Sequence, residues 1–405
     1  MSDNIPSSGQ EQKPQVHLNT TPPVPMSGVS LGGGPKWYQN KKTLGLIGGI
    51  VALLIVIGLG VYAAMRPTQQ DPLVEDDDKG IFGQLSGAGD REEDAVRDIS
   101  GLSGMKCEHP TRRPIGVMLA GDPINRPISG FAKADLVLEM PVLTSDVTRL
   151  TAFYQCGEPT DIGSVRSARH DYLFMAEGFD AILGHWGGSY HALNRIAAGE
   201  FQTINALTNP YNAFFRKNTL PAPYNGFTTY ERLWNALSQL GYRQETKFKG
   251  YEFKDDAAAA ERGTTGTLTI GWPGQFRVSY EYDPATNRYQ RFWAGVKVVD
   301  GEDNTTPVAP SVVAIMRAEN QLADGPGGYN EMAIEGEGPA VVYQDGKEIK
   351  GTWKKNVLFK NDPVHFMNES GNEITFTRGQ VWIMAVEPSI AVTWESAATT
   401  APVTP

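Results

Sequence analysis

Short apolar runs alternate with helical patterns in the first half of the folded part of the chain. Four segments have the apolar and β-branched content that is typical of strands: RPIGVMLA, DLVLEMPVL, VTRLTAFYQC and DAILGHW. SARHDYLFMAEGF and TTYERLWNALSQLG have helical composition, and the second offers Thr228 or Thr229 as a cap and Gly241 at its end. Because strand-like and helix-like pieces interleave, we expect an α/β domain over residues 106–250.

Helical periodicity almost disappears after residue 250. RVSYEYDPATNRYQRFW consists of two alternating aromatic runs around a turn, and EITFTRGQVWIMAV adds two strand-like runs. AVVYQDGKEIKGTWKK places Asp345 and Gly346 where a two-residue hairpin turn requires positive φ. The pattern predicts a mainly antiparallel β domain over residues 251–395, followed by a disordered tail over 396–405.

Residues 44–65, LGLIGGIVALLIVIGLGVYAAM, contain no charge and are long enough to cross roughly 30 Å of hydrocarbon. They predict a single transmembrane helix. Lys36, Lys41 and Lys42 precede it and DPLVEDDDKG follows, so we expect the N-terminus in the cytoplasm and the rest outside it. A cleaved signal peptide is the alternative, but a polar leader of residues 1–43 is unlike a signal.

The segments beside this run are polar. Residues 1–43 predict a disordered cytoplasmic tail, and residues 66–105 predict an extended acidic linker. Gly45 and Gly49 form one small-xxx-small pair, which is compatible with a homodimer through the membrane helix.

Charge and cysteine content narrow the classes of partner. The 405 residues carry a formal net charge of -10, which argues against nucleic-acid binding, so any anion site must be local. The two cysteines, Cys107 and Cys156, favour a disulfide over free thiols or a metal pair, because zinc needs three or four ligands. We predict no metal and no cofactor.

The segment IGSVRSAR contains the best candidate for a binding site. If a serine in it starts the following helix, Arg166 and Arg169 lie in or next to the first turn on one face. Two guanidinium groups at a helix N-terminus predict a clamp for a carboxylate or a phosphate. The alternative is a pair of surface arginines that bind Asp161, Asp171 or Glu177.

A second candidate follows the strand DAILG. His185 could carry a proton or donate a hydrogen bond, the face of Trp186 suits a sugar ring or a cation, and Gly187 and Gly188 let backbone approach a ligand. The alternative is a turn with a half-buried tryptophan. His191 could join a metal site, but no suitable third ligand lies near it in the sequence.

Charged residues on the predicted strands give further candidates. Glu139 lies between apolar residues, so we expect it to be buried and paired with Arg149 of the next strand, or else to be a catalytic carboxylate. In GDPINRP, Asp122, Asn125 and Arg126 follow the first strand and could border the same crevice, although the motif is first of all a turn.

Recognisable catalytic motifs are absent. The sequence contains no G-x-S-x-G, H-E-x-x-H or P-loop pattern. Whether the chain is an enzyme therefore stays open.

The sequences of several segments, and their order along the chain, resemble those of a known family. RPIGVMLAGDPINRPISGFAKADLVLEMPV, VTRLTAFYQC, IGSVRSAR and FDAILGHWGGS, with NRYQRFWAG and GNEITFTRGQVWI later, are similar to the bacterial YerB-like lipoproteins, which pair an N- and a C-terminal domain of unknown function. The resemblance covers residues 113–386 and implies a membrane-attached extracytoplasmic protein. Unlike a lipoprotein, the chain has no cysteine between residues 44 and 106 to carry a lipid.

These observations predict a cell-envelope protein that binds an anionic ligand, such as a wall glycan or a peptide carboxylate. A wall-modifying hydrolase that uses Glu139, Asp122 or His185 as acid or base is one alternative. A scaffold whose β half pairs with another membrane protein is the other.

Overall fold

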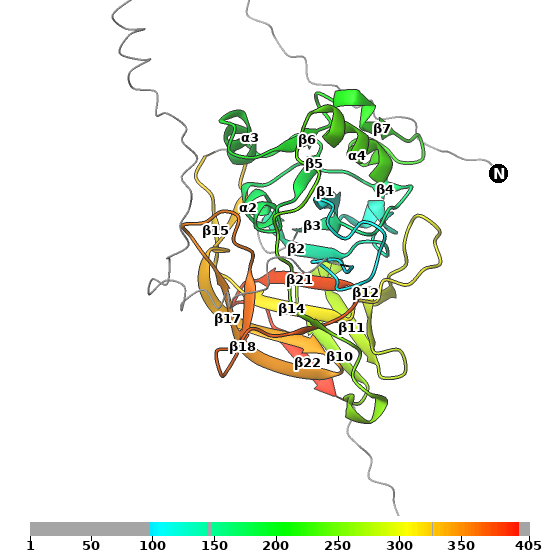
Figure 1. The fold of residues 1–405 in the computed structure, drawn as a ribbon, viewed down its shortest axis with the longest axis vertical. Coiled ribbons are helices and arrows are strands. Elements are labelled where there is room, and N and C mark those ends of the chain that lie inside the picture. Colours follow the sequence, from blue (N-terminus) through cyan, green and yellow to red (C-terminus); the bar gives the residue numbers. More distant parts are fainter. Residues whose placement is uncertain (1–97, 144–146, 326, 397–405) are drawn as a thin grey trace, which may run out of the picture. The chain divides into compact units, whose positions relative to one another are not determined.

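The computed structural model describes residues 98–143, 147–325 and 327–396 (Figure 1). The predicted cytoplasmic tail, the predicted membrane helix with its glycine pair and most of the predicted linker lie outside these residues. Within the described ranges, no helix is long and apolar enough to cross a membrane.

A ten-stranded sheet forms the centre of the fold. In spatial order its strands are β19 (His365–Asn368), β18 (Lys347–Lys355), β17 (Gly336–Gln344), β14 (Val312–Arg317), β21 (Val381–Val386), β2 (Leu136–Leu143), β3 (Val147–Tyr154), β1 (Ile115–Ala120), β5 (Ile182–His185) and β6 (Thr203–Asn205). β21 pairs in parallel with both β14 and β2 and lies between them in Figure 1. The two segments predicted as separate domains therefore contribute to one continuous sheet.

The remaining strands form one more large sheet and three small ones. The five-stranded sheet has the order β13 (Val296–Lys297), β12 (Arg288–Trp293), β11 (Val278–Asp283), β10 (Gly266–Ile270) and β22 (Val392–Ser396). The small sheets are β15 (Asn320–Leu322) with β16 (Asn330–Met332), β20 (Phe376–Thr377) with β9 (Phe253–Lys254), and β4 (Ile162–Gly163) with β8 (Gly226–Thr228) and β7 (Phe214–Arg216).

The prediction of an α/β first half is wrong, because the described chain is mainly β. Its three α-helices are α2 (His170–Gly178), α3 (Tyr190–Ala197) and α4 (Tyr230–Gln239), none longer than 10 residues. Among the strands of the first half in the central sheet, β5 pairs in parallel with both β1 and β6, whereas β3 pairs antiparallel with both β1 and β2. The first α-helix among the described residues comes only after β4, and β14, β17, β18, β19 and β21 of the second half extend the same sheet. Local alternation of patterns could not show this pairing.

Several local predictions are confirmed. Thr229 caps α4 by accepting a hydrogen bond from the N–H of Arg232 at 3.1 Å, and Gly241 follows the helix with φ +69°. Asp345 and Gly346 connect β17 to β18 with φ values of 53° and 71°, as the two-residue hairpin turn requires. Cys107 and Cys156 form a disulfide, the pairing that the sequence favours.

The central sheet is buried on both faces. Val117, Leu119 and Leu150 belong to the core on one face, which also includes side chains of α4 and of the five-stranded sheet. Met118 and Met140 belong to the core on the other face, with side chains of α2 and α3. Alternate residues of a strand point to opposite faces. The position of a polar residue along β1, β2 or β3 therefore decides which of the two cores its side chain enters.

One charged pair crosses from the central sheet to the five-stranded sheet. Arg291 of β12 donates to Glu139 of β2 at 2.8 Å, and both side chains are 0% exposed. Glu139 also accepts from the hydroxyl of Thr148 at 2.8 Å, and Arg291 donates to the hydroxyl of Tyr280 at 2.6 Å. The Arg291 guanidinium lies 4.2 Å from the ring centroid of Trp382. The pair is thus hydrogen-bonded on both sides and enclosed by aromatic rings.

Breaking this pair should destabilise the fold strongly. In Glu139→Gln or Arg291→Met one member of the pair is left buried without its partner, so the free energy of unfolding should fall by about 3–5 kcal/mol. Denaturant unfolding of the purified chain measures the change. Glu337→Gln, which removes an exposed ion pair to Lys354, is the control and should cost at most about 1 kcal/mol. Equal losses in the two experiments would contradict the buried pair.

Candidate functional site

Residues 164–166 lie as an extended segment beside the end of β1. β5 pairs with the first three residues of β1. Further along the same edge of β1, Val165 of this segment pairs with Leu119. Ala120 donates to the carbonyl of Ser164 at 3.0 Å, and the main-chain N–H of Arg166 donates to Met118 at 2.9 Å. Trp186, just after β5, donates to the carbonyl of Arg166 at 2.9 Å. The segment is therefore held between the ends of two parallel strands.

The register places two arginines and a serine on one face of the sheet. Val165 lies opposite Leu119 and belongs to the core beside α4, so Ser164 and Arg166 point to the other face. Arg149 of β3 lies opposite Ala120 from the other side and shares that face. The small side chain of Ala120 thus separates Arg149 from Ser164.

Arg169 brings a third guanidinium group to this place. It is the N-cap residue of α2, with extended φ and ψ of −124° and 150°, so Arg166 precedes the helix instead of lying in its first turn. Nη1 of Arg169 donates to the carbonyl of Ser167 at 3.3 Å, and Nη1 of Arg149 donates to the same oxygen at 3.5 Å. Arg149, Arg166 and Arg169 are called the arginine cluster below.

The arginine cluster has no carboxylate ion pair within the described residues. Arg149 is 3% and Arg169 6% exposed, and the Nε atoms of all three arginines are buried without a hydrogen-bond partner. Burial, together with the charges of Arg169 and Arg166, lowers the pKa of Arg149 to about 9. Burial also lowers the pKa of Arg169. Two buried cations and a third that is partly exposed, Arg166, favour the binding of an anion.

Further polar atoms without partners border the arginine cluster. The hydroxyl of Ser164, Oδ2 of Asp122 and Oδ1 of Asn125 are buried and accept no hydrogen bond from the described residues. Asn125 donates to the carbonyl of Ala120 at 3.1 Å, and Tyr224 donates to Oδ1 of Asp122 at 3.2 Å. The end of β1 therefore carries both donors and acceptors that the fold leaves unused.

Comparison with known proteins identifies the family. The N-terminal domain of the "Protein of unknown function (DUF3048)" family matches residues 99–243, and its C-terminal domain matches residues 268–383. The chain belongs to the DUF3048 family. It is 30% identical over 312 residues to the "Putative lipoprotein YerB" of Bacillus subtilis (strain 168), covering 73% of this chain and 90% of that protein.

A solved structure shares the fold of this DUF3048 chain. The crystal structure of the YerB protein from Bacillus subtilis matches with a TM-score of 0.65 and 27% identity, over 73% of this chain and 100% of that chain. The resemblance inferred from the sequence segments is thus confirmed by sequence and by structure.

The DUF3048 fold brings only part of the second candidate to the arginine cluster. Gly187 accepts a hydrogen bond from the N–H of Ala168 at 2.9 Å, so the turn after β5 touches the segment that carries the arginines. Trp186 instead packs on Phe214, 6.1 Å between centroids, and under the guanidinium of Arg216 at 4.2 Å. Gly188 forms a β-bridge with Ala168, and a Cβ at this position would meet Leu193 of α3 at 3.2 Å. The tryptophan therefore lies away from the arginines.

His185 is buried below this turn. It is 0% exposed, its Nδ1 lies 2.6 Å from the carbonyl oxygen of Gly187, and its Nε2 has no partner among the described residues. Burial lowers the pKa of His185 to about 4, so the ring is neutral at physiological pH.

The predicted pair of Glu139 with Arg149 is wrong. In the register of β2 and β3, Glu139 lies opposite Leu150, whereas Arg149 lies opposite Met140. Residues that are one position apart in register point to opposite faces, so the two side chains face different cores. Arg291 takes the place of Arg149 as the partner of Glu139.

Arg126 also lies away from the arginine cluster. Its guanidinium donates to the carbonyl of Gly121 at 2.8 Å and stacks 3.8 Å from the ring centroid of Trp293, in the five-stranded sheet. Asp122, Asn125 and Arg126 thus remain together at the end of β1, but Arg126 is directed toward the other sheet.

The sequence did not indicate three residues beside the arginines. Ser164 could have been found, because it lies two positions before Arg166 in an extended segment. Tyr224 lies 4.8 Å from the guanidinium of Arg166, and Tyr329 lies 4.6 Å from that of Arg169. Both tyrosines come from loops distant in the sequence, and no local pattern marks them.

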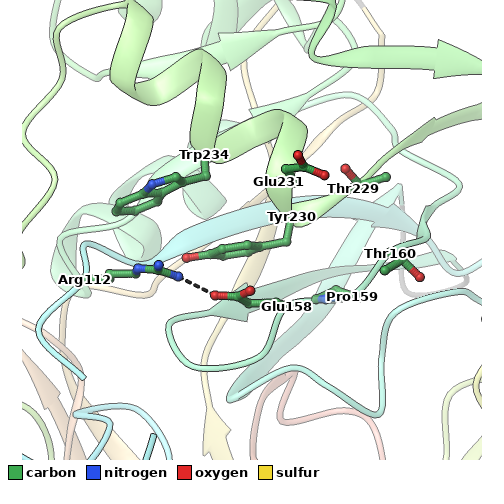
Figure 2. Close-up of a pocket in the computed structure, with 8 residues that line it drawn as sticks. All are labelled: Arg112, Glu158, Pro159, Thr160, Thr229, Tyr230, Glu231 and Trp234. Carbon is green, nitrogen blue, oxygen red and sulfur yellow. Dashed lines mark hydrogen bonds and ion pairs between the residues drawn. The ribbon is translucent and has the colours of Figure 1, made fainter. Parts of the chain in front are cut away.

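Two cavities of about 360 Å³ each lie outside the arginine cluster. Figure 2 shows the first, at the start of α4, where Arg112 forms an ion pair with Glu158 below the rings of Tyr230 and Trp234. Arg112 lies 4.9 Å from the Trp234 centroid, so its charge is already paired and stacked. The second cavity is lined by His170 and Asp171, directly after Arg169.

Acid should destabilise the DUF3048 domain through His185. Its folded pKa of about 4 lies below the unfolded value of about 6.5, so between these values the unfolded chain binds the extra proton. Stability should therefore fall as the pH decreases from about 6.5 to 4, by about 3 kcal/mol in total. Denaturant unfolding at a series of pH values measures this slope.

Two variants separate His185 from the other titrating groups. His185→Gln should flatten the acid limb of the stability curve, whereas His109→Gln, at a half-exposed site, should leave it unchanged. An unchanged slope in His185→Gln would show that the ring is charged or solvated in the folded chain.

Proposed function

We propose that this DUF3048 protein is a membrane-attached, extracytoplasmic envelope protein whose arginine cluster binds an anionic group. The ligand would be an envelope component, such as a wall glycan or a peptide carboxylate. The observation that carries the proposal is the set of three guanidinium groups without a carboxylate partner among the described residues. A guanidinium fork matches a carboxylate or phosphate in two-pronged geometry.

The location is supported by the relative and by the disulfide. The Bacillus subtilis relative is named a putative lipoprotein, and a lipoprotein is attached to a membrane by its lipid. The Cys107–Cys156 disulfide is compatible with an oxidising compartment outside the cytoplasm. The uncharged run of residues 44–65 is the attachment that the sequence predicts, and this stays a prediction.

The structure offers less support for a hydrolase. Glu139 is fully buried and bound to Arg291, and His185 is fully buried with a lowered pKa. A general acid or base must come within hydrogen-bond reach of its substrate. Asp122 accepts from the hydroxyl of Tyr224 at 3.2 Å, and no observation favours a catalytic role for it over a binding role. No observation favours the scaffold either.

The proposed location can be tested by proteolysis. Protease added to intact spheroplasts should digest the DUF3048 domain, because it would lie outside the membrane. Lysed spheroplasts serve as the control for cleavage, and a cytoplasmic protein serves as the control for intact membranes. Protection of the domain until lysis would contradict the extracytoplasmic location.

Loss of a guanidinium should weaken anion binding. Each charge-assisted contact typically contributes about 1.5–3 kcal/mol, so Arg166→Ala or Arg169→Ala should reduce affinity by roughly tenfold or more. Lysine should rescue only in part, because an ammonium lacks the planar fork. Calorimetric titration of the full chain in detergent with muropeptides and anionic wall polymers, at two salt concentrations, measures the affinities.

Two further variants make this test specific. Arg277→Ala removes an exposed arginine at the start of β11 and should leave affinity unchanged. Arg149→Met removes a buried charge but retains an apolar side chain, so it should weaken binding while it preserves or raises the melting temperature. Equal affinities in wild type and all arginine variants would remove the proposed site.

A further inference from the structure

The cavity beside the arginine cluster has the opposite charge. Its wall includes the carboxylates of Asp171, Glu319, Glu331 and Glu335. Arg195 also lines it, but Arg195 forms an ion pair with Glu200 at 3.0 Å. The cavity is therefore acidic, and it lies next to the basic arginine cluster.

His170 supplies an unused hydrogen-bonding atom on the cavity wall. Its side chain is 7% exposed, and Nε2 lies 2.9 Å from Oδ1 of Asp171 and 3.8 Å from Oε1 of Glu331. Nδ1 is buried and has no partner among the described residues. Burial lowers the pKa of His170, but the hydrogen bond from Nε2 to Asp171 and the charges of Asp171 and Glu331 raise it above its ordinary value. Nδ1 accepts from an N–H group only in the neutral ring, so a bound N–H donor requires His170 to release its extra proton. Nδ1 is therefore an unused hydrogen-bonding atom that a ligand group could engage.

Two chain segments connect the cavity to the arginine cluster. Arg169 and His170 are consecutive at the start of α2. On the facing segment, Tyr329 lies under the guanidinium of Arg169, and Glu331 lies beside His170. Tyr329 directly precedes β16, and Glu331 lies within it.

From this juxtaposition we infer that the ligand carries an ammonium group as well as a carboxylate, as in an amino acid or a short peptide. The arginine cluster binds the carboxylate. The cavity binds the ammonium group, which donates to Nδ1 of His170 and to Glu331. This inference rests on the proposed function, and it selects a peptide over a phosphate polymer or a neutral glycan.

Blocking one end of a peptide at a time tests the inference. The probes are alanine, dialanine and trialanine in L and D forms, each free, N-acetylated or C-amidated, titrated into the full chain in detergent. We expect one length to bind most tightly, and acetylation or amidation of that probe to weaken binding by roughly tenfold or more, because each removes a charge.

Protein variants identify which end each site binds. Glu331→Gln should weaken the free peptide roughly tenfold but leave the affinity of the acetylated peptide unchanged, because that peptide has no ammonium group to lose. Arg166→Ala should weaken the free and the acetylated peptide alike. Glu335→Gln is a second cavity variant, and Glu281→Gln, an exposed carboxylate of β11, is the control that should change nothing. Melting temperatures show whether each variant folds.

The outcomes separate this inference from the proposed function. If acetylation and Glu331→Gln have no effect while Arg166→Ala weakens binding of any anionic probe, the second site is wrong and the anion site stands. The same holds if wall polymers bind and no peptide does. If Arg166→Ala changes the affinity of no probe, both the anion site and the inference fail.

Discussion

The buried ion pair between Glu139 and Arg291 connects the two large sheets, and the arrangement of the described domain depends on it. One partner comes from β2, in the first half of the chain, and the other from β12, in the second half. Next to it, β21 pairs with β2 and makes the central sheet continuous across both halves. Neither family domain can bury its share of this core alone, because the strands that cover Leu150 and Trp382 come from both.

This pairing also explains why Arg149 has no carboxylate partner among the described residues. Glu139 forms its ion pair with Arg291 on one face of the sheet. Arg149 points to the opposite face, so Glu139 cannot pair with it. On that face burial and the charges of Arg169 and Arg166 lower the pKa of Arg149. Retaining three such cations costs stability unless an anion binds, which is the pattern expected of a functional site rather than of a structural one.

In the proposed site, the acidic cavity next to the arginines would orient a ligand that carries both charges. A carboxylate at the arginine cluster and an ammonium group near His170 would each lie where the opposite charge is concentrated. Complementary potentials at the two ends favour one orientation of a ligand and disfavour purely anionic competitors. The first cavity, where Arg112 is already paired with Glu158, lacks this unused charge.

Local features of this protein could be predicted from its sequence, whereas neighbours in space could not. The cap of α4 at Thr229, the turn at Asp345 and Gly346, and the strand that ends at His185 follow from interactions within a few residues. The two arginines in SVRSAR were also visible. The α/β expectation failed and Glu139 was paired with the wrong arginine, because the face of a strand residue depends on register with distant segments, here a partner 152 residues away. The sequence by itself determined which residues are charged and where turns occur, and only the tertiary structure decided which charges meet.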